Sequence, residues 1–299
     1  MELKLPRRDF LINSFCCASN ILYLSRAVAD TPSIRKRIPC STIDTSFDSE
    51  SVNPFKIEES GSFEINDHAK AFNMTPFGTA FLSTRWQRDD GQDKGSDVIK
   101  LGVAFINGTS SDRQILKNAA KAWNDKVSQY IMFLFDGIEI NTADIRVKFD
   151  PRGGNKSLVG RLAKNNIDVT SPTLNIADVD IDTCEHELGH ALGLLHEHQF
   201  PGESIIWNEP KVIKDMAALG WDEKTTRQQI LDKYRSSAVC IGDPQLNISS
   251  IMMYWTLDDW GKFKDEKGAW HQLNIDTQPI SDRDVKCVRG VYAFKGQSQ

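Results

Sequence analysis

The sequence lacks a run of about 20 uninterrupted apolar residues, which a helix needs in order to cross a membrane. It also lacks an excess of positive charge, because its formal net charge is -5 and its isoelectric point is about 5.7. A nucleic-acid partner would require a basic face to meet its phosphates. We therefore expect neither a stable membrane anchor nor a nucleic-acid partner for this chain of 299 residues.

The N-terminal segment has the features of an export signal. Lys4, Arg7 and Arg8 give it a basic start, and a moderately apolar stretch follows them. Small residues at 27–29 fit a signal-peptidase cleavage site, and the adjacent arginines resemble the twin-arginine export signal of bacteria. We therefore expect residues 1–29 to be an export signal and the mature protein to be secreted or periplasmic. A frayed N-terminal helix is the alternative.

Cysteine is scarce, with six residues in the whole chain. Removal of the N-terminal segment would leave four of them: Cys40, Cys184, Cys240 and Cys287. An even set in an exported protein suggests up to two disulfides, with three possible pairings. The twin-arginine route carries folded proteins out of a reducing cytosol. Either these bridges therefore close after export, or one of the two interpretations, twin-arginine export or disulfide formation, is wrong.

Residues 30–80 lack the periodicity of a helix or a strand and are rich in serine, acidic residues and proline. Such a composition is typical of a linker or a pro-segment rather than of a folded domain. We therefore expect the folded domain to begin near residue 81.

Strand patterns mark the first part of this domain. Apolar and polar residues alternate over 99–105 and 145–149, which predicts two half-buried strands. A short apolar run at 132–135 and the pair Leu174 and Ile176 indicate further strands, the last of which leads to a segment rich in histidine. This order of elements predicts an α/β lobe whose sheet has one mostly exposed face.

One helix is expected between the first two strands. Ser111 and Gln114 have the spacing of a capping box at its start. Its apolar residues recur at helical spacing, at Ile115, Ala119, Ala122, Trp123 and Val127. Beyond Pro201 the pattern becomes irregular, so we expect a second region with little regular structure.

Four of the six histidines lie between His186 and His198. His186 and His190 are four residues apart, so both imidazoles project from one face of a helix. Two imidazoles on one face form half of a tetrahedral zinc site. Glu187 follows the first histidine, where its carboxylate can reach a water at the metal without binding the metal itself. The spacing therefore predicts a zinc site with a built-in general base.

His196 is the expected third ligand. It would point away from the metal if the helix continued beyond His190, so the chain must leave the helix between them. Gly193 is suited to that role, because glycine tolerates positive φ and ends helices at low cost. Glu203 or Glu209 could complete the site instead, as in thermolysin, but both lie in an irregular stretch without a helix to present them. Incidental histidines on a buried amphipathic helix are the remaining alternative.

Several residues near this motif are better explained by structure than by metal binding. His198 follows two residues after the last expected ligand and is interpreted as a surface histidine or a neighbour of the ligands. Cys184 lies on another face of the same helix, where a disulfide or a buried thiol is expected. Trp255, Trp260 and Trp270 either line a pocket or form the core of the second region, and the core is favoured.

The segment His186–His196 resembles the signature of metzincin zinc peptidases. In metzincins a tight turn carrying a methionine lies beneath the zinc site, and Met252 matches that methionine. In the astacin-like branch the turn reads Ser-(Ile/Val)-Met-His-Tyr, with a tyrosine that can bind zinc and then move to stabilise the transition state. Tyr254 matches this tyrosine, whereas Met253 stands where the family has histidine.

The resemblance covers roughly residues 80–296 and implies a fold and an activity. The fold would be an α+β metzincin catalytic domain at 81–296, with an upper mixed twisted sheet backed by helices, a lower irregular lobe and zinc in the cleft. The activity would be zinc-dependent endopeptidase cleavage of protein or peptide substrates by a monomer holding one catalytic Zn²⁺. Glu187 would be the general base and acid, and Tyr254 a second catalytic residue.

Two further expectations concern the substrate and the segment before the domain. A peptide substrate would lie extended along a sheet edge, for which residues 157–160 are the candidate. The position and irregularity of residues 30–80 suggest that this segment blocks the cleft until it is removed, with an acidic residue or Cys40 reaching the zinc. Two alternatives stay open: a zinc hydrolase acting on cell-wall peptides, and a secreted binding module in which zinc is only structural.

Overall fold

The computed structural model describes residues 40–41, 80, 84–166, 168–200, 202, 205–234, 246–257 and 259–293. The chain divides into two units, Met1–Lys36 and Arg37–Gln299, and all described residues belong to the second. The expected export signal at 1–29 lies outside the described residues, as does most of the expected pro-segment at 30–80. No helix in the described ranges is long and apolar enough to cross a membrane.

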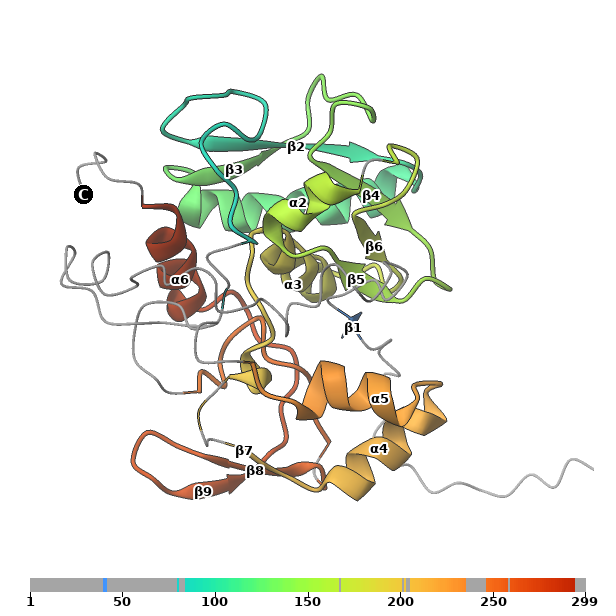
Figure 1. Ribbon diagram of the computed structural model, residues 1–299, viewed down its shortest axis with the longest axis vertical. Helices are drawn as coiled ribbons and strands as arrows, with labels where there is room; N and C mark the ends of the chain where they lie inside the picture. Colours follow the sequence, from blue (N-terminus) through green and yellow to red (C-terminus); the bar gives the residue numbers. More distant parts are fainter. Residues whose placement is uncertain are drawn as a thin grey trace, which may run out of the picture. The chain divides into compact units, whose positions relative to one another are not determined.

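Six strands form a mixed sheet in the order β1-β5-β6-β4-β2-β3 (Figure 1). Their bounds are β1 Cys40–Ser41, β2 Ile99–Phe105, β3 Ile131–Leu134, β4 Ile145–Phe149, β5 Asn155–Ser157 and β6 Leu174–Ile176. Strand β2 pairs in parallel with β3 and β4, and β4 pairs in parallel with β6. Strand β5 runs antiparallel to β6. The strands predicted from alternation are therefore confirmed, and the sheet is mixed as expected.

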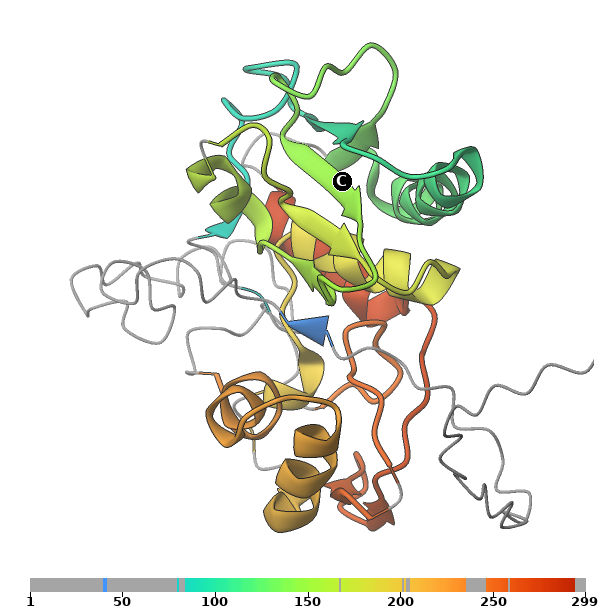
Figure 2. The same cartoon turned by 90° about the vertical axis from the view of Figure 1, so that its right-hand side faces the viewer.

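Helices α2 (Ser110–Val127), α3 (Ile181–Ala191) and α6 (Asp282–Tyr292) accompany this sheet, and α2 packs against both of the others (Figures 1 and 2). The face of α2 that is buried against them consists of Leu116, Ala119, Ala120, Trp123 and Val127. The indole Nε1 of Trp123 donates a hydrogen bond to the Glu185 carbonyl at 2.9 Å, which ties α2 to α3. The expected stripe is confirmed at three positions, while Ile115 and Ala122 are only partly buried.

The capping box of α2 lies two residues earlier in the sequence than the predicted pair, Ser111 and Gln114. Thr109 is the N-cap: its hydroxyl accepts from the Asp112 N–H, and the Asp112 carboxylate accepts from the Thr109 N–H. Gln114 instead donates to the Asn118 side chain on the exposed surface at 2.9 Å. The prediction was wrong because Gly108, at φ +98, turns the chain before Thr109, and a positive φ is costly for other residues.

The region after Pro201 is more regular than expected. Strands β7 (Ile205–Trp207), β8 (Gly261–Lys264) and β9 (Trp270–Gln272) form an antiparallel sheet, and helices α4 (Glu209–Ala218) and α5 (Glu223–Thr226) lie beside it (Figure 1). Trp260 is fully buried in the apolar cluster under α4, as the core interpretation predicted, whereas Trp270 is exposed. Periodicity could not reveal this sheet because its strands are only three or four residues long and two helices separate β7 from β8.

The cysteines do not pair as a set of four. Cys184 is a free, fully buried thiol on α3, and burial raises its pKa far above the usual range. Cys287 on α6 is disulfide-bonded. Each of the three complete pairings includes Cys184, so none of them holds, and the buried-thiol interpretation of Cys184 is confirmed.

Candidate active site

Helix α3 presents the first half of the site. Its N-cap is Asp180, whose carboxylate accepts a hydrogen bond from the Thr183 N–H at 2.8 Å, so the helix begins at Ile181. One turn of helix separates His186 from His190, and their rings meet edge to face with centroids 4.7 Å apart. Both imidazoles therefore project from the same face of α3, as predicted.

The helix ends where the argument about His196 requires it to end. The Gly193 N–H donates to the His190 carbonyl at 2.8 Å, and the Leu194 N–H donates to the Gly189 carbonyl at 3.0 Å. This pair of bonds is a Schellman motif, with Gly193 at φ +96 in the left-handed position. The turn reverses the direction of the chain and returns His196 to within 4.8 Å of His190, measured between ring centroids.

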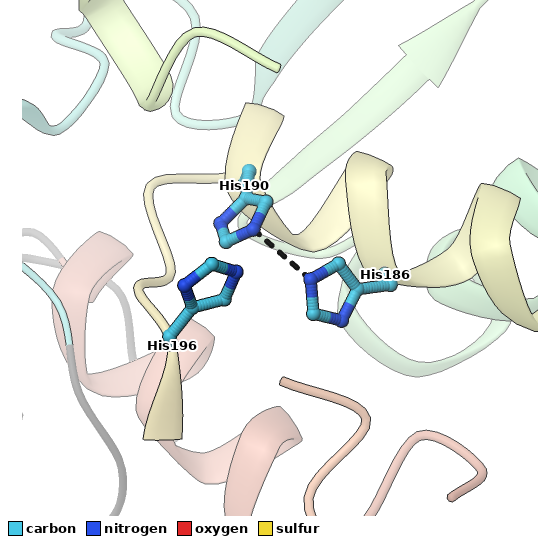
Figure 3. Close-up of side chains that lie close together, drawn as sticks. All are labelled: His186, His190 and His196. Atoms are coloured by element: carbon cyan, nitrogen blue, oxygen red, sulfur yellow. Dashed lines mark hydrogen bonds between the residues drawn. The ribbon is translucent and has the colours of Figure 1, made fainter. Parts of the chain in front are cut away.

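The three histidines form one cluster. One nitrogen from each of His186, His190 and His196 lies within 4.8 Å of the others, a spacing that could hold a metal ion. Figure 3 shows the rings of His186 and His190 projecting from the helix, and the ring of His196 entering from the segment that follows it. This is the only such cluster among the residues that the structure describes.

Backbone carbonyls orient two of the rings. The Nδ1 of His186 lies 2.7 Å from the Ile251 carbonyl oxygen, and the Nδ1 of His190 lies 2.8 Å from the Leu194 carbonyl oxygen. A carbonyl only accepts hydrogen bonds, so each Nδ1 must carry the proton. The two Nε2 atoms therefore turn their lone pairs toward one another at 3.1 Å (Figure 3). Such an arrangement fits a cation held between them.

The protonation states and the burial of the cluster also fit a metal. Burial lowers the pKa of His186 to about 4. Burial and the neighbouring imidazoles lower the pKa values of His190 and His196 well below their usual range. All three rings are therefore neutral at pH 7, as metal ligands must be. Neither ring nitrogen of the fully buried His196 has a hydrogen-bond partner of ordinary geometry among the described residues.

A cavity that is open to solvent adjoins the cluster. Its described lining residues are Asn155, Asp182, Thr183, His186, Glu187, Ile251, Met253, Tyr254, Trp255 and Thr277. The two residues predicted to be catalytic, Glu187 and Tyr254, are thus brought to the same cavity as His186. The ring of Tyr254 also lies 5.5 Å from the ring of His196, centroid to centroid.

Comparison with known proteins matches this geometry to a family. The profile of the peptidase family described as Astacin matches residues 103–257, which are 155 of the 299 residues. The chain belongs to the astacin family. It is a metzincin zinc metalloendopeptidase that acts on proteins or peptides with one catalytic zinc ion, so the recognition, fold class, activity and cofactor predicted from the sequence are confirmed. Comparison with curated proteins found no match.

Solved structures of astacin-like proteins resemble the chain. The structure of myroilysin is 26% identical, with a TM-score of 0.56, and the match covers 73% of this chain and 100% of myroilysin. A hatching enzyme zinc-protease of the medaka fish Oryzias latipes, high choriolytic enzyme 1, is 17% identical with a TM-score of 0.46. That match covers 71% of this chain and 95% of the hatching enzyme.

The methionine turn lies beneath α3, as the astacin resemblance implied. Met252 is buried, and a Cβ added to Gly189 would lie only 2.5 Å from its sulfur. The absence of a side chain at Gly189 therefore lets Met252 contact the helix between the two histidines. The preceding residue, Ile251, supplies the carbonyl that orients His186. The turn thus supports the ligand helix through both packing and a hydrogen bond.

One residue that supports this turn was not found from the sequence. The Asp284 carboxylate, on α6, accepts hydrogen bonds from the Ser250 hydroxyl and from the Ile251 N–H at 3.0 Å. It also completes a capping box with Ser281 at the start of α6. Burial raises the pKa of Asp284, and these hydrogen bonds oppose that rise. The capping-box spacing of Ser281 and Asp284 could have located the start of α6. Only the fold, however, brings Asp284 to Ile251, the residue whose carbonyl orients His186.

The other residues weighed as ligands lie outside the cluster. His198 is buried rather than on the surface, and its Nε2 lies 3.1 Å from the Gln229 carbonyl oxygen, so it is a neighbour of the ligands. The carboxylate of Glu209 pairs with Arg227 at 2.8 Å, and both side chains of this pair are exposed. Glu203 lies outside the described residues. Among the described residues, His196 is therefore the third member of the cluster.

The strand near the expected substrate edge begins and ends earlier in the sequence than predicted. Residues 157–160 contain only the last residue of β5, because a 3-10 helix begins at Gly160. The strand beside the cavity is Asn155–Ser157, and Asn155 lines the cavity itself. The strand begins directly after Gly154, two residues before the predicted edge, and ends at Ser157.

Proposed function

We propose that His186, His190 and His196 hold the catalytic zinc through their Nε2 atoms. The observation that supports this assignment is the pair of Nδ1-to-carbonyl contacts, which directs two Nε2 lone pairs toward one point beside the third ring. A structural zinc site is closed by four protein ligands, whereas a catalytic site keeps one position for water. The described residues supply three ligands, and a cavity opens beside them.

Glu187 acts in this proposal as the general base and then as the general acid. Zinc held by three neutral imidazoles supplies Lewis acidity, which lowers the pKa of water to about 7 and polarises a carbonyl. Glu187 accepts a proton from the attacking water and delivers it to the leaving amine. Its carboxylate lies on the residue next to His186 and lines the same cavity, so both proton transfers occur within reach of one side chain.

Tyr254 and β5 position the substrate. The Tyr254 hydroxyl donates a hydrogen bond to the oxyanion that develops on the scissile carbonyl, and donors of this kind contribute about 3 kcal/mol. The extended peptide lies along β5 and forms backbone hydrogen bonds with it, as an added strand.

Neither alternative, the hydrolase of cell-wall peptides or the non-catalytic binding module, is favoured for a member of a peptidase family.

The activity is tested by incubating the purified mature enzyme with a denatured protein and, separately, with purified cell wall. We expect new peptide termini in the denatured protein, loss of this cleavage with a zinc chelator, and recovery when zinc is added back. Release of wall peptides without cleavage of the denatured protein would contradict the endopeptidase assignment.

Tyr254→Phe removes only the hydroxyl that the proposal uses. We expect kcat to fall by about 10²-fold, because one oxyanion donor is lost, while the zinc content stays near that of the unmodified enzyme. The matched control is Tyr234→Phe, a buried tyrosine that does not line the cavity. Equal kcat values for the Tyr254→Phe variant and the unmodified enzyme would rule out the transition-state role.

We further propose that residues 30–80 form an inhibitory pro-segment, that 81–296 is the catalytic domain and that residues 1–29 direct export. Support for the pro-segment comes from β1, because Cys40 pairs in parallel with Asn155, which lines the cavity beside His186. A segment that follows β5 at this point occupies the edge proposed for the substrate. Either Cys40 or an acidic residue of the segment would then reach the metal.

Mass spectrometry of the active species tests the pro-segment. We expect chains that retain residues 30–80 to cleave peptides slowly, and chains trimmed near residue 81 to cleave them fast. If Cys40 supplies the blocking group, Cys40→Ala should raise the activity of the untrimmed chain. An untrimmed chain as active as the trimmed one would dispose of the latency proposal.

A further inference from the structure

We propose that Asp182 selects substrates with a lysine or arginine next to the cleaved bond. The inference rests on the proposed function, because it concerns the cavity in which Glu187 and Tyr254 would act. Asp182 lies in the first turn of α3, four residues before His186 and therefore on the same face of the helix. The rise between the two residues is about 6 Å, so the carboxylate lies one turn from the first proposed zinc ligand.

The charge of the cavity favours a cationic side chain. Asp182 and Glu187 are its acidic lining residues, and none of its described lining residues is lysine or arginine. Glu187 is committed to proton transfer in the proposed mechanism, so Asp182 is the acidic group left to meet a substrate side chain. A single carboxylate in a protease pocket is sufficient to select lysine and arginine.

The carboxylate of Asp182 is held in place but keeps an acceptor site. Its Oδ2 accepts a hydrogen bond from the Thr277 hydroxyl at 2.8 Å. Its Oδ1 accepts no hydrogen bond from the described residues, and the side chain is partly exposed to the cavity. The Thr277 contact fixes the orientation of the group, which lowers the cost of ordering it when a cation binds.

The apolar part of the cavity lining suits the stem of such a side chain. Ile251, Met253 and Trp255 give the cavity an apolar surface. Lysine and arginine pack their methylene stems on apolar surface while the charged head reaches a polar partner. Met253 is the residue that departs from the histidine of the astacin turn, and it makes this wall apolar. A long cationic residue therefore fits both ends of the cavity.

Competition between two peptides in one tube tests the inference. The peptides are identical except that the residue adjoining the cleaved bond, varied on each side in turn, is lysine or leucine. The ratio of their kcat/KM values does not depend on the fraction of active enzyme, so a partly misfolded variant still reports it. We expect the unmodified enzyme to prefer lysine on one side of the bond.

Two variants of Asp182 should change this ratio. Asp182→Asn keeps the size and the Thr277 contact but removes the charge, and we expect the preference for lysine to fall about tenfold, as for loss of a hydrogen bond to a charged group. Asp182→Arg should reverse the preference, so that a glutamate peptide is cleaved faster than the lysine peptide. Asp125→Asn, an exposed acid on α2 paired with Lys121, is the matched control and should leave the ratio unchanged.

The outcomes separate this inference from the proposed function. Cleavage of both peptides with no preference for lysine on either side, or an unchanged ratio in Asp182→Asn, would overturn the role of Asp182 and leave the peptidase assignment intact. Failure of the unmodified, zinc-loaded enzyme to cleave any peptide would overturn the proposed function and this inference with it.

Discussion

Glu187→Gln should reduce peptide hydrolysis by orders of magnitude while leaving zinc binding near that of the unmodified enzyme. Glutamine has the same size and can accept a hydrogen bond, but it cannot take a proton from water at neutral pH. Loss of a general base typically costs about 10² to 10⁴ in rate, so kcat should fall by that factor. Zinc content, measured by mass spectrometry of the intact holoenzyme, should remain one ion per chain because Glu187 is not a member of the histidine cluster.

The matched control for this variant is Glu185→Gln, the same chemical change on the same helix. Glu185 lies two residues earlier and does not line the cavity. We expect its kcat to stay within a few fold of the unmodified value, which would show that the effect at Glu187 is not a general effect of charge on α3. Undiminished turnover in Glu187→Gln would refute the general-base role.

His196→Gln should weaken zinc binding more than any change outside the histidine cluster. Loss of a group that only orients a ligand typically costs about 10-fold to 100-fold in metal affinity, so loss of a ligand should cost more. The affinity is measured by competition with a chelator of known strength. Far-UV circular dichroism of the metal-free variant should match that of the metal-free unmodified enzyme, which separates loss of metal from loss of fold.

His198→Gln is the control for this second variant. His198 is buried beside His196, with ring centroids 5.0 Å apart, but its ring is turned to the Gln229 carbonyl. We expect its zinc affinity to stay within about tenfold of the unmodified enzyme, less than the loss typical of a group that orients a ligand, because its Nε2 contacts the Gln229 carbonyl and not a ligand histidine. Comparable losses in the two variants, or no loss in His196→Gln, would contradict the assignment of His196 as the third ligand.

The local parts of this site could be predicted from the sequence because they depend on helix geometry. The spacing of His186, His190 and His196 requires a break in the helix, and glycine is the residue that makes such a break cheaply. The structure confirms the break at Gly193 and the convergence of the three rings. The role of each residue in catalysis stays a prediction, which the variants above are designed to test.

The remaining parts depend on contacts between residues far apart in the chain, which periodicity does not reveal. The carbonyl that orients His186 belongs to Ile251, 65 residues later. The carboxylate that holds Ile251 belongs to Asp284, 33 residues later again. The strand near the expected substrate edge at 157–160 runs over Asn155–Ser157 instead, because the length of the preceding turn decides where β5 begins. The even number of cysteines left open how many of them pair, because parity in sequence does not show that Cys184 is a free thiol buried on α3.

The central claim, that three histidines hold one catalytic zinc ion, is tested most directly by diffraction from zinc-loaded crystals. Data collected on either side of the zinc absorption edge locate the metal without assumptions about its ligands. The account predicts a single anomalous peak about 2.0–2.1 Å from the Nε2 atoms of His186, His190 and His196, with no further ligand from the mature catalytic domain except the Tyr254 hydroxyl. A peak elsewhere, or a site closed by a fourth ligand of that domain other than Tyr254, would contradict it.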